Sequence, residues 1–152
     1  MTRELLIFRH GKSDRKVRSD NYHRPLKDGG KRDAQRAGVW LAQQGLVPDQ
    51  VISSPAERAR VSAEKACKAM GLYTGKIDRD RRVYKADLNA LLEVLGECPD
   101  SSRRVMLVGH NPGLEDLLRY LAQGDLPVAL KDKLLPTAAI TSACMRLRRF
   151  SM

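Results

Sequence analysis

The chain has 152 residues and a mass of 17.0 kDa, which is enough for one domain with a substantial buried core. Hydrophobic residues make up 42% and charged residues 30%, as in soluble globular proteins, and no apolar run reaches membrane-spanning length. The net charge of +10 is spread along the chain and aromatic residues amount to only 5%, so we expect neither a nucleic-acid nor a membrane partner. A basic surface of this kind attracts anionic substrates.

The three cysteines, Cys67, Cys98 and Cys144, are an odd number without a close pair. This spacing argues against both a disulfide framework and a zinc knuckle. The first residues lead into an apolar run without a cleavable signal pattern, so we expect a cytoplasmic protein. No linker, repeat or low-complexity segment interrupts residues 1–152, which predicts a single domain.

The apolar run at residues 2–8 predicts a first strand that is buried on both faces and ends in Arg9, His10 and Gly11. Residues 9–27 form a long polar loop, and loops of this length are usually functional or mobile. A helix is predicted over residues 28–44, with Asp28 as its cap and Gly45 at its end.

Residues 50–53 predict a short second strand. A helix then starts, with Ser54 as the cap and Pro55 in the first turn, and Gly71 ends it. Arg58 falls in the first turn of this helix, where free backbone N–H groups favour an anion, so it is a candidate phosphate ligand. Residues 76–84 are polar and extended, as in an edge strand or a connection.

A third helix is predicted over residues 88–95 and a further strand over residues 105–108, which ends in Gly109 and His110. Asn111 and Pro112 open a fourth helix, in which we expect Asn111 to be the cap and to position His110. Residues 134–150 predict a last strand.

Strands that alternate with helices predict an α/β fold in which a mostly parallel central sheet carries helices on both faces. The carboxyl ends of parallel strands meet at one edge of the sheet, where ligands bind in open α/β folds. We therefore expect Arg9, His10, Arg58 and His110 to converge there.

Two arginines, two histidines and a helix N-terminus form a site for a dianion, most naturally a phosphoryl group, because a guanidinium binds phosphate oxygens in a bidentate fork. One histidine could be a nucleophile if it is neutral, and the positive charges of Arg9 and Arg58 favour the neutral ring. A hydrogen bond from its other nitrogen to a backbone carbonyl would fix the tautomer.

Three motifs in order resemble the signatures of the histidine phosphatase superfamily: Arg9-His10-Gly11, then residues 53–59 (SSPAERA), then residues 108–113 (VGHNPG). The small size of the chain, residues 9–14 (RHGKSD) and residues 24–26 (RPL) look most like its SixA-type phosphohistidine phosphatase branch. The resemblance implies a three-layer α/β/α, phosphoglycerate mutase-like fold.

The resemblance also implies that His10 is the nucleophile and becomes a transient phosphohistidine. Arg9 and Arg58 would bind the phosphoryl oxygens, and His110 would stabilise the charge that develops on the same group. Water would hydrolyse the intermediate, with neither metal nor cofactor. Ser13 either touches a phosphate oxygen or caps the loop.

Relatives that act on phosphate monoesters use a carboxylic acid to protonate the leaving oxygen. Asp87 is the candidate for this acid, but it is also placed to cap the helix that begins at Leu88. An imidazole that leaves from phosphohistidine needs less help from an acid than an alkoxide does. A missing acid therefore favours phosphohistidine. The short interval between Arg58 and His110 leaves no room for a capping subdomain, so we expect an open site that admits a phosphorylated protein.

Two alternatives remain open: a phosphatase that acts on small phosphate esters by the same mechanism, and a non-catalytic phosphate-binding interaction module. A metal site that joins His10, His23 and His110 is disfavoured, because the arginines would repel a cation. We assign His23 a loop or surface role. The expected partner is a phosphorylated protein or a small phosphate compound, and the expected state is a monomer.

Overall fold

Two parallel strands, β1 (Thr2–Arg9) and β4 (Arg104–Gly109), form the middle of the sheet in a computed structural model that describes residues 2–122 and 140–146. The five-stranded sheet has the order β3-β2-β4-β1-β5, where β2 is Gln50–Ser53, β3 is Asp78–Arg79 and β5 is Ile140–Arg146. The first four strands are parallel, and β5 runs antiparallel to β1.

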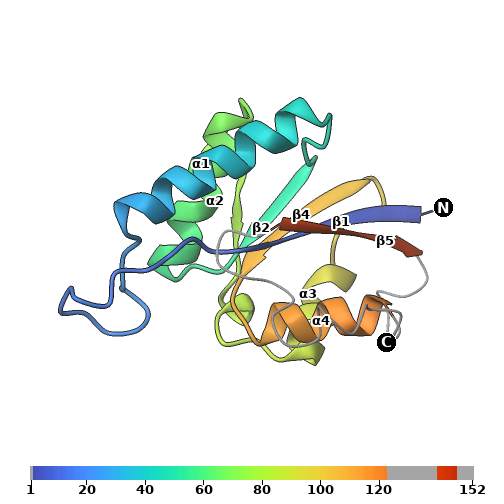
Figure 1. Ribbon diagram of the computed structural model, residues 1–152. Coiled ribbons are helices and arrows are strands. Elements are labelled where there is room, and N and C mark those ends of the chain that lie inside the picture. Colours follow the sequence, from blue (N-terminus) through green and yellow to red (C-terminus); the bar gives the residue numbers. More distant parts are fainter. Residues whose placement is uncertain (1, 123–139, 147–152) are drawn as a thin grey trace.

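The helices cover both faces of this sheet (Figure 1). The helices α1 (Asp28–Gln43) and α2 (Glu57–Ala69) lie on one face, and α3 (Leu88–Gly96) and α4 (Gly113–Ala122) lie on the other. Two short 3-10 helices, Thr74–Lys76 and Arg81–Val83, flank β3. The expected α/β fold with a mostly parallel sheet between two helical layers is confirmed.

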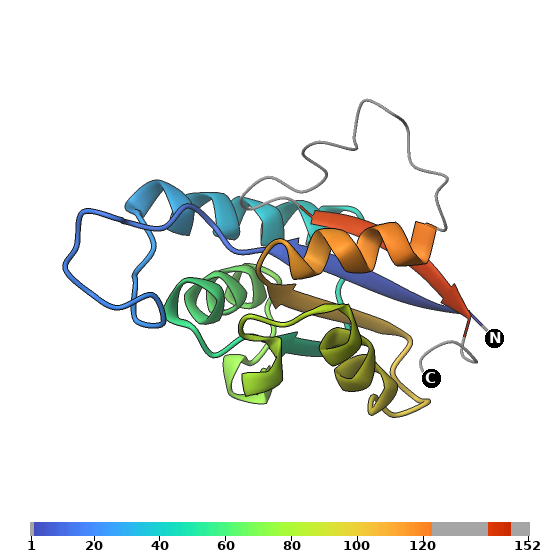
Figure 2. The ribbon, with the colours of Figure 1, turned by 90° about the horizontal axis from the view of Figure 1, so that it is seen from below.

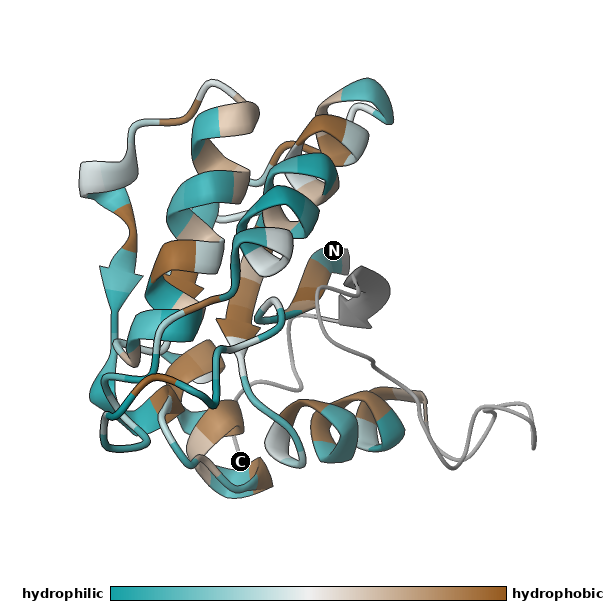
Figure 3. Ribbon diagram, turned by 60° about the vertical axis from the view of Figure 1, so that its left-hand side comes forward, coloured by the Kyte–Doolittle hydropathy of each residue, from teal (hydrophilic) through white to brown (hydrophobic). Residues whose placement is uncertain are grey.

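Alternate residues of the central strands face opposite helical layers. Leu5 and Ile7 of β1 pack in the cluster that includes residues of α3 and α4, whereas Leu6 and Phe8 pack with residues of α1 and α2. All four side chains are fully buried, and each contributes about 1.5–3 kcal/mol to the free energy of unfolding. Figure 3 shows the same pattern, with hydrophobic strands inside and hydrophilic residues on the outer faces of the helices. The continuous apolar run of β1 is thus explained by burial on both faces.

Residues 10–27 leave the carboxyl end of β1 and project beyond the edge of the sheet (Figure 2). Backbone hydrogen bonds join the two arms of this loop near its base: Asp14 N–H donates to the Pro25 carbonyl at 2.8 Å, and Lys27 N–H donates to the Lys12 carbonyl at 2.9 Å. A bridge between Ser13 and Leu26 lies between these bonds. The base of the loop is therefore a defined structure.

The helices α1 and α2 end just before the predicted glycines, but both helices start at other residues than predicted. Gly45 and Gly71 adopt positive φ angles of 69° and 78° just after α1 and α2. Asp28 is the first residue of α1 and not its cap, a position in which its carboxylate still interacts favourably with the helix dipole. The helix α2 begins at Glu57 and not directly after Ser54, because Ser54 Oγ accepts from Ala56 N–H in a turn that precedes the helix.

The remaining boundaries differ in smaller ways. Residues 76–84 contain the edge strand β3, but it is only two residues long and lies between the two 3-10 helices. The helix α4 starts at Gly113, because His110–Pro112 form the turn that leads into it. The last strand is confirmed at Ile140–Arg146, and the rest of the predicted range, 134–139 and 147–150, lies outside the described residues. Across the described part of the chain, no helix is long and apolar enough to cross a membrane.

Candidate active site

The register of the two central strands brings two histidines together. Arg9 pairs with Gly109 at the carboxyl ends of β1 and β4, so that the next residue of each strand is a histidine. His10 N–H donates to the Gly109 carbonyl at 3.2 Å, and the ring centroids of His10 and His110 lie 5.1 Å apart. Because β1 and β4 are paired in this register and each is followed by a histidine, both histidines line one cleft.

The His10 ring is held by a backbone carbonyl. Its Nδ1 lies 2.7 Å from the carbonyl oxygen of Gly11, and because a carbonyl only accepts, Nδ1 is the nitrogen that carries the proton. Burial lowers the pKa of His10 to about 4; the Gly11 hydrogen bond partly opposes this shift, and the positive charges of Arg58, Arg9 and Arg24 add to it. At neutral pH the ring is thus neutral, and Nε2 has a free lone pair.

His110 is held by a hydroxyl group instead. Its Nε2 lies 2.8 Å from Oγ of Ser54, which is fully buried and bonded through its own N–H to the Val108 carbonyl. Burial lowers the pKa of His110 to about 3, and repulsion from His10 and the arginines lowers it further. Its Nδ1 has no hydrogen-bond partner among the described residues. The edge-on ring of Tyr84, 5.7 Å away between centroids, packs beside it.

Three arginines surround these rings. Arg9 ends β1, Arg58 is the second residue of α2, and Arg24 comes from the returning arm of the loop. The Arg58 side chain is 5% exposed and donates through Nη1 to the Asn21 carbonyl, which ties the loop to α2. Burial, followed by the charge of Arg24, lowers the pKa of Arg58. The guanidinium groups of Arg24 and Arg58 are therefore close enough to repel each other, and an anion between them would relieve that repulsion.

The cleft has a volume of about 470 Å³ and is strongly basic. The described residues that line it are Arg9, His10, Lys12, Ser13, Arg15, Lys16, Arg24, Lys27, Arg58, His110 and Asn111. None of these lining residues is Asp or Glu. Two neutral imidazoles set among cations form a site that can hold a phosphoryl dianion and present a nitrogen nucleophile to it.

The structure places the residues singled out in the sequence as follows. Arg9, His10, Arg58, His110 and Ser13 line the cleft. The backbone of Ser13 also forms the bridge to Leu26, so that both of the roles considered for this residue fit its position.

Asp87 lies outside the cleft lining, is exposed, and caps α3 by accepting from Ala90 N–H at 2.8 Å. Its position thus fits the capping role and does not place it as an acid on the phosphoryl group. His23 is exposed and pairs with Asp20 at 2.9 Å, in keeping with a loop role. Asn111 lines the cleft and donates to the Glu115 carboxylate at 2.9 Å.

Sequence reasoning assigned no role to three residues that shape the site: Arg24, Ser54 as a partner of His110, and Ser62. Ser62 Oγ accepts from Gly11 N–H at 2.9 Å and donates to the Arg58 carbonyl at 2.6 Å, so that it connects the segment after β1 to α2. Arg24 did carry a signal, because it precedes Pro25 in a loop with an expected function. Nothing local distinguishes Ser62 from other helical serines.

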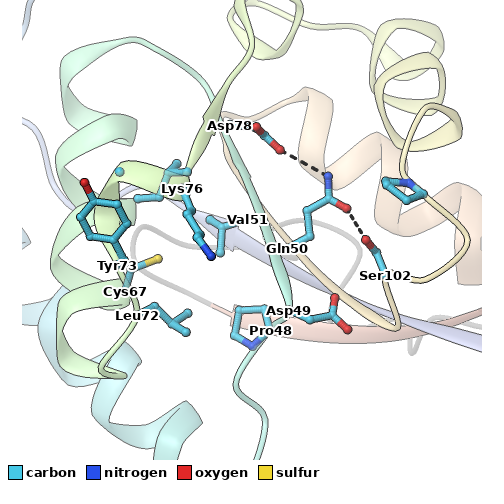
Figure 4. Close-up of a pocket in the computed structure, with 13 residues that line it drawn as sticks. Pro48, Asp49, Gln50, Val51, Cys67, Leu72, Tyr73, Lys76, Asp78 and Ser102 are labelled. Atoms are coloured by element: carbon cyan, nitrogen blue, oxygen red, sulfur yellow. Dashed lines mark hydrogen bonds between the residues drawn. The ribbon is translucent and has the colours of Figure 1, made fainter.

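A second cavity, of about 430 Å³, lies at the opposite end of the sheet, beside the first residues of β2 and β3 (Figure 4). Its polar side chains are used within the fold: Gln50 donates to Asp78 at 3.3 Å and accepts from Ser102 at 2.6 Å. Burial raises the pKa of Cys67, at its inner wall, to about 11, so this thiol stays protonated. None of the catalytic candidates lies in this cavity.

Within residues 2–122 and 140–146, no group of three or more His, Cys, Asp or Glu side chains is placed to hold a metal ion. The arginine-lined cleft is suited to an anion and not to a cation.

Fold and site together define an α/β protein with a basic cleft, containing two histidines, at the carboxyl edge of its sheet. Residues 5–83 match the family model of the histidine phosphatase superfamily (branch 1), and the chain belongs to this superfamily. A comparison with curated proteins gave no match.

Solved structures with the same fold include SixA proteins. One from Agrobacterium tumefaciens, provisionally assigned as the phosphohistidine phosphatase SixA, is 26% identical with a TM-score of 0.82 over 92% of this chain and 89% of that chain. A similarly assigned protein from Nakamurella multipartitia is 25% identical, with a TM-score of 0.74 over 95% and 85% of the two chains. The protein histidine phosphatase SixA in complex with tungstate is 23% identical, with a TM-score of 0.79 over 91% and 86%, and it shows likeness of fold. Family and structural neighbours support a hydrolase of the phosphatase class.

Proposed function

We propose that the protein is a phosphohistidine phosphatase that acts without a metal ion through a covalent intermediate on His10. The observation that carries this proposal is the His10 ring itself. The ring is neutral, and its Nδ1–H donates a hydrogen bond to the Gly11 carbonyl, which leaves Nε2 unprotonated. His10 lines a cleft whose described lining contains Arg9, Arg24 and Arg58 but no carboxylic acid.

In the first step, the lone pair of His10 Nε2 attacks the phosphorus atom in line with the bond to the substrate imidazole. That P–N bond breaks, its electron pair leaves with the substrate imidazole, and the leaving nitrogen takes up a proton from solvent water. The Nδ1–H bond to Gly11 stabilises the positive charge that develops on the His10 ring. The arginines neutralise the equatorial phosphoryl oxygens, and His110, held by Ser54, contacts the same group. Water then displaces His10 and releases inorganic phosphate.

The lack of a carboxylic acid in the described lining of the cleft supports a nitrogen leaving group. An alkoxide needs a proton as its bond to phosphorus breaks, whereas an imidazole is a far better leaving group. Transfer from a substrate histidine to His10 also exchanges one P–N bond for another, so the step is nearly balanced in energy. Both points favour phosphohistidine over small phosphate esters.

The test compares the kcat/KM of the wild type for a phosphohistidine peptide with that for an aryl phosphate and a sugar phosphate. We expect a preference for the peptide of about 100-fold or more, because each ester lacks an acid for its leaving oxygen. His10→Ala should abolish turnover of all three substrates while phosphate still binds. Faster turnover of an ester would assign the protein to small phosphate esters, and binding without any turnover would assign it to the phosphate-binding modules.

A further inference from the structure

Six arginines outside the cleft lining are paired with carboxylates. The ion pairs lie between 2.5 and 3.8 Å: Arg36–Asp33, Arg60–Glu64, Arg79–Glu64, Arg82–Asp80, Arg82–Glu97, Arg104–Glu4, Arg119–Glu115 and Arg119–Asp116. The charges of these six arginines are thus opposed by carboxylates within the fold.

The mouth of the cleft gathers cations that have no such pairs within the described part of the chain. Four exposed cations, Lys12, Arg15, Lys16 and Lys27, line it and form what we call the basic rim. None of them has an ion pair with a carboxylate of the described residues. The one carboxylate within this arm, Asp14, accepts from the backbone N–H of Lys16. The basic rim is therefore uncompensated positive charge.

The basic rim exceeds what the phosphoryl group requires. Arg9, Arg24 and Arg58 already supply three positive charges around a group that carries at most two negative ones. The charge of Arg15 also acts on Arg58, whose pKa it helps to lower, so rim and phosphoryl site repel each other. Further negative charge on the substrate, outside the phosphoryl group, would relieve this repulsion.

The position of the basic rim indicates how that negative charge is arranged. Lys12 and Lys27 lie opposite each other at the base of the loop, joined by the hydrogen bond between Lys27 N–H and the Lys12 carbonyl. Arg15 and Lys16 follow on an arm that projects beyond the edge of the sheet (Figures 1 and 2). Exposed charges that extend outward suit an extended anionic surface better than one compact second phosphate, which needs converging donors.

We propose that the basic rim recognises carboxylate side chains that flank the phosphohistidine on an acidic segment of a protein substrate. Lys12, Arg15, Lys16 and Lys27 are then specificity residues that act on binding and not on the phosphoryl transfer itself. This proposal rests on the proposed function and adds to it the charge of the substrate around the reacting residue.

The experiment uses two synthetic peptides, each with one phosphohistidine, that differ only in whether Glu or Gln flanks it. It compares wild type, Arg15→Gln/Lys16→Gln, and the control Lys65→Gln/Lys68→Gln, which removes the same charge from exposed positions on α2, outside the cleft lining. The rim variant should lose about fivefold in kcat/KM for the Glu peptide, through KM, and change little for the Gln peptide. The control should behave as wild type.

Salt gives a second readout of the same contact. Raising the ionic strength from about 0.05 to about 0.5 M should increase the KM of the wild type for the Glu peptide more than that of the rim variant, because exposed charges are screened.

The possible failures are distinct. If the wild type hydrolyses neither peptide, the proposed function is wrong. If it hydrolyses both with the same KM, or if the rim variant loses equally on both, the proposed function stands and the acidic partner is wrong. A rim variant that loses affinity for inorganic diphosphate, but not for the Glu peptide, would show that the rim binds a second phosphate.

Discussion

Three features of its surroundings determine the protonation state of His10. Burial disfavours the imidazolium, and the positive charges of the arginines in the cleft disfavour it further. The Gly11 carbonyl accepts a hydrogen bond from Nδ1–H and so fixes the tautomer of the neutral ring. The position therefore keeps the ring neutral well below neutral pH and determines that Nε2 is the nitrogen with the free lone pair. His23, in contrast, is exposed and is paired with Asp20.

The low pKa values of the two buried histidines predict a pH-dependent stability. His10 and His110 have folded pKa values of about 4 and about 3, below the ordinary value of 6.5, so the unfolded chain binds protons first. The free energy of unfolding should be highest above pH 6.5 and should fall as the pH drops toward 4. His110 alone should contribute a loss of about 2 kcal/mol by about pH 4.5.

Urea unfolding at pH 7 and at about pH 4.5 measures this loss. His110→Gln should lose less stability between these two pH values than the wild type does, because the buried, neutral ring is no longer there to take up a proton on unfolding. Equal losses for the wild type and His110→Gln would show that His110 is not held neutral in the folded state.

The residues of the site were predictable to different degrees. Arg9, His10 and His110 stand directly at strand ends, and Arg58 in a helix first turn, so local patterns indicate them. Arg24 reaches the cleft because the loop folds back on itself, a long-range event that no local pattern records. The hydrogen bond between Ser54 and His110 could not be predicted either. The local sequence indicates that Ser54 is a helix cap, and its contact with His110 depends on the pairing of the two strands.

The packing of α1 against α2 depends on one glycine. A Cβ on Gly38 would lie 2.3 Å from the carbonyl oxygen of Ala66, a backbone atom that cannot rotate away. Gly38→Ala should therefore lower the free energy of unfolding by about 2 kcal/mol, even though alanine is the better helix former.

Gly29→Ala is the matched control on the same helix, because the nearest atom to a Cβ there is in the flexible Arg32 side chain of α1 itself, at 3.8 Å. We expect this variant to be as stable as the wild type, or more stable by about 0.5–1 kcal/mol. Urea denaturation of the three proteins gives the comparison. A Gly38→Ala protein as stable as Gly29→Ala would mean that the helices do not approach this closely.

At the scale of elements, types were predicted better than boundaries. The apolar periodicity located four helices, and glycines at 45 and 71 located two of their ends, because positive φ favours glycine there. Starts were less certain, since Ser54 and Asp28 can cap a helix, precede it or stand in its first turn. Only tertiary contacts decide among these positions.

At the scale of the whole molecule, alternation of strands and helices predicted the layers and the edge where the site lies. The strand order and the antiparallel direction of β5 were not predicted, because they depend on which strands pair and not on the sequence of any one strand. The net charge of +10 can be counted from the sequence alone. The gathering of cations at the mouth of the cleft, unpaired among the described residues, is visible only in the folded structure.

The central claim is that the phosphoryl group passes through His10, and intact-protein mass measurement tests it most directly. Wild type and His10→Ala would be mixed with a phosphohistidine peptide and quenched rapidly without acid, since a phosphohistidine is labile to acid. The account predicts a transient gain of one phosphoryl group on the wild type, lost on acid treatment, and none on His10→Ala. An adduct on His10→Ala, or turnover by that variant, would contradict it.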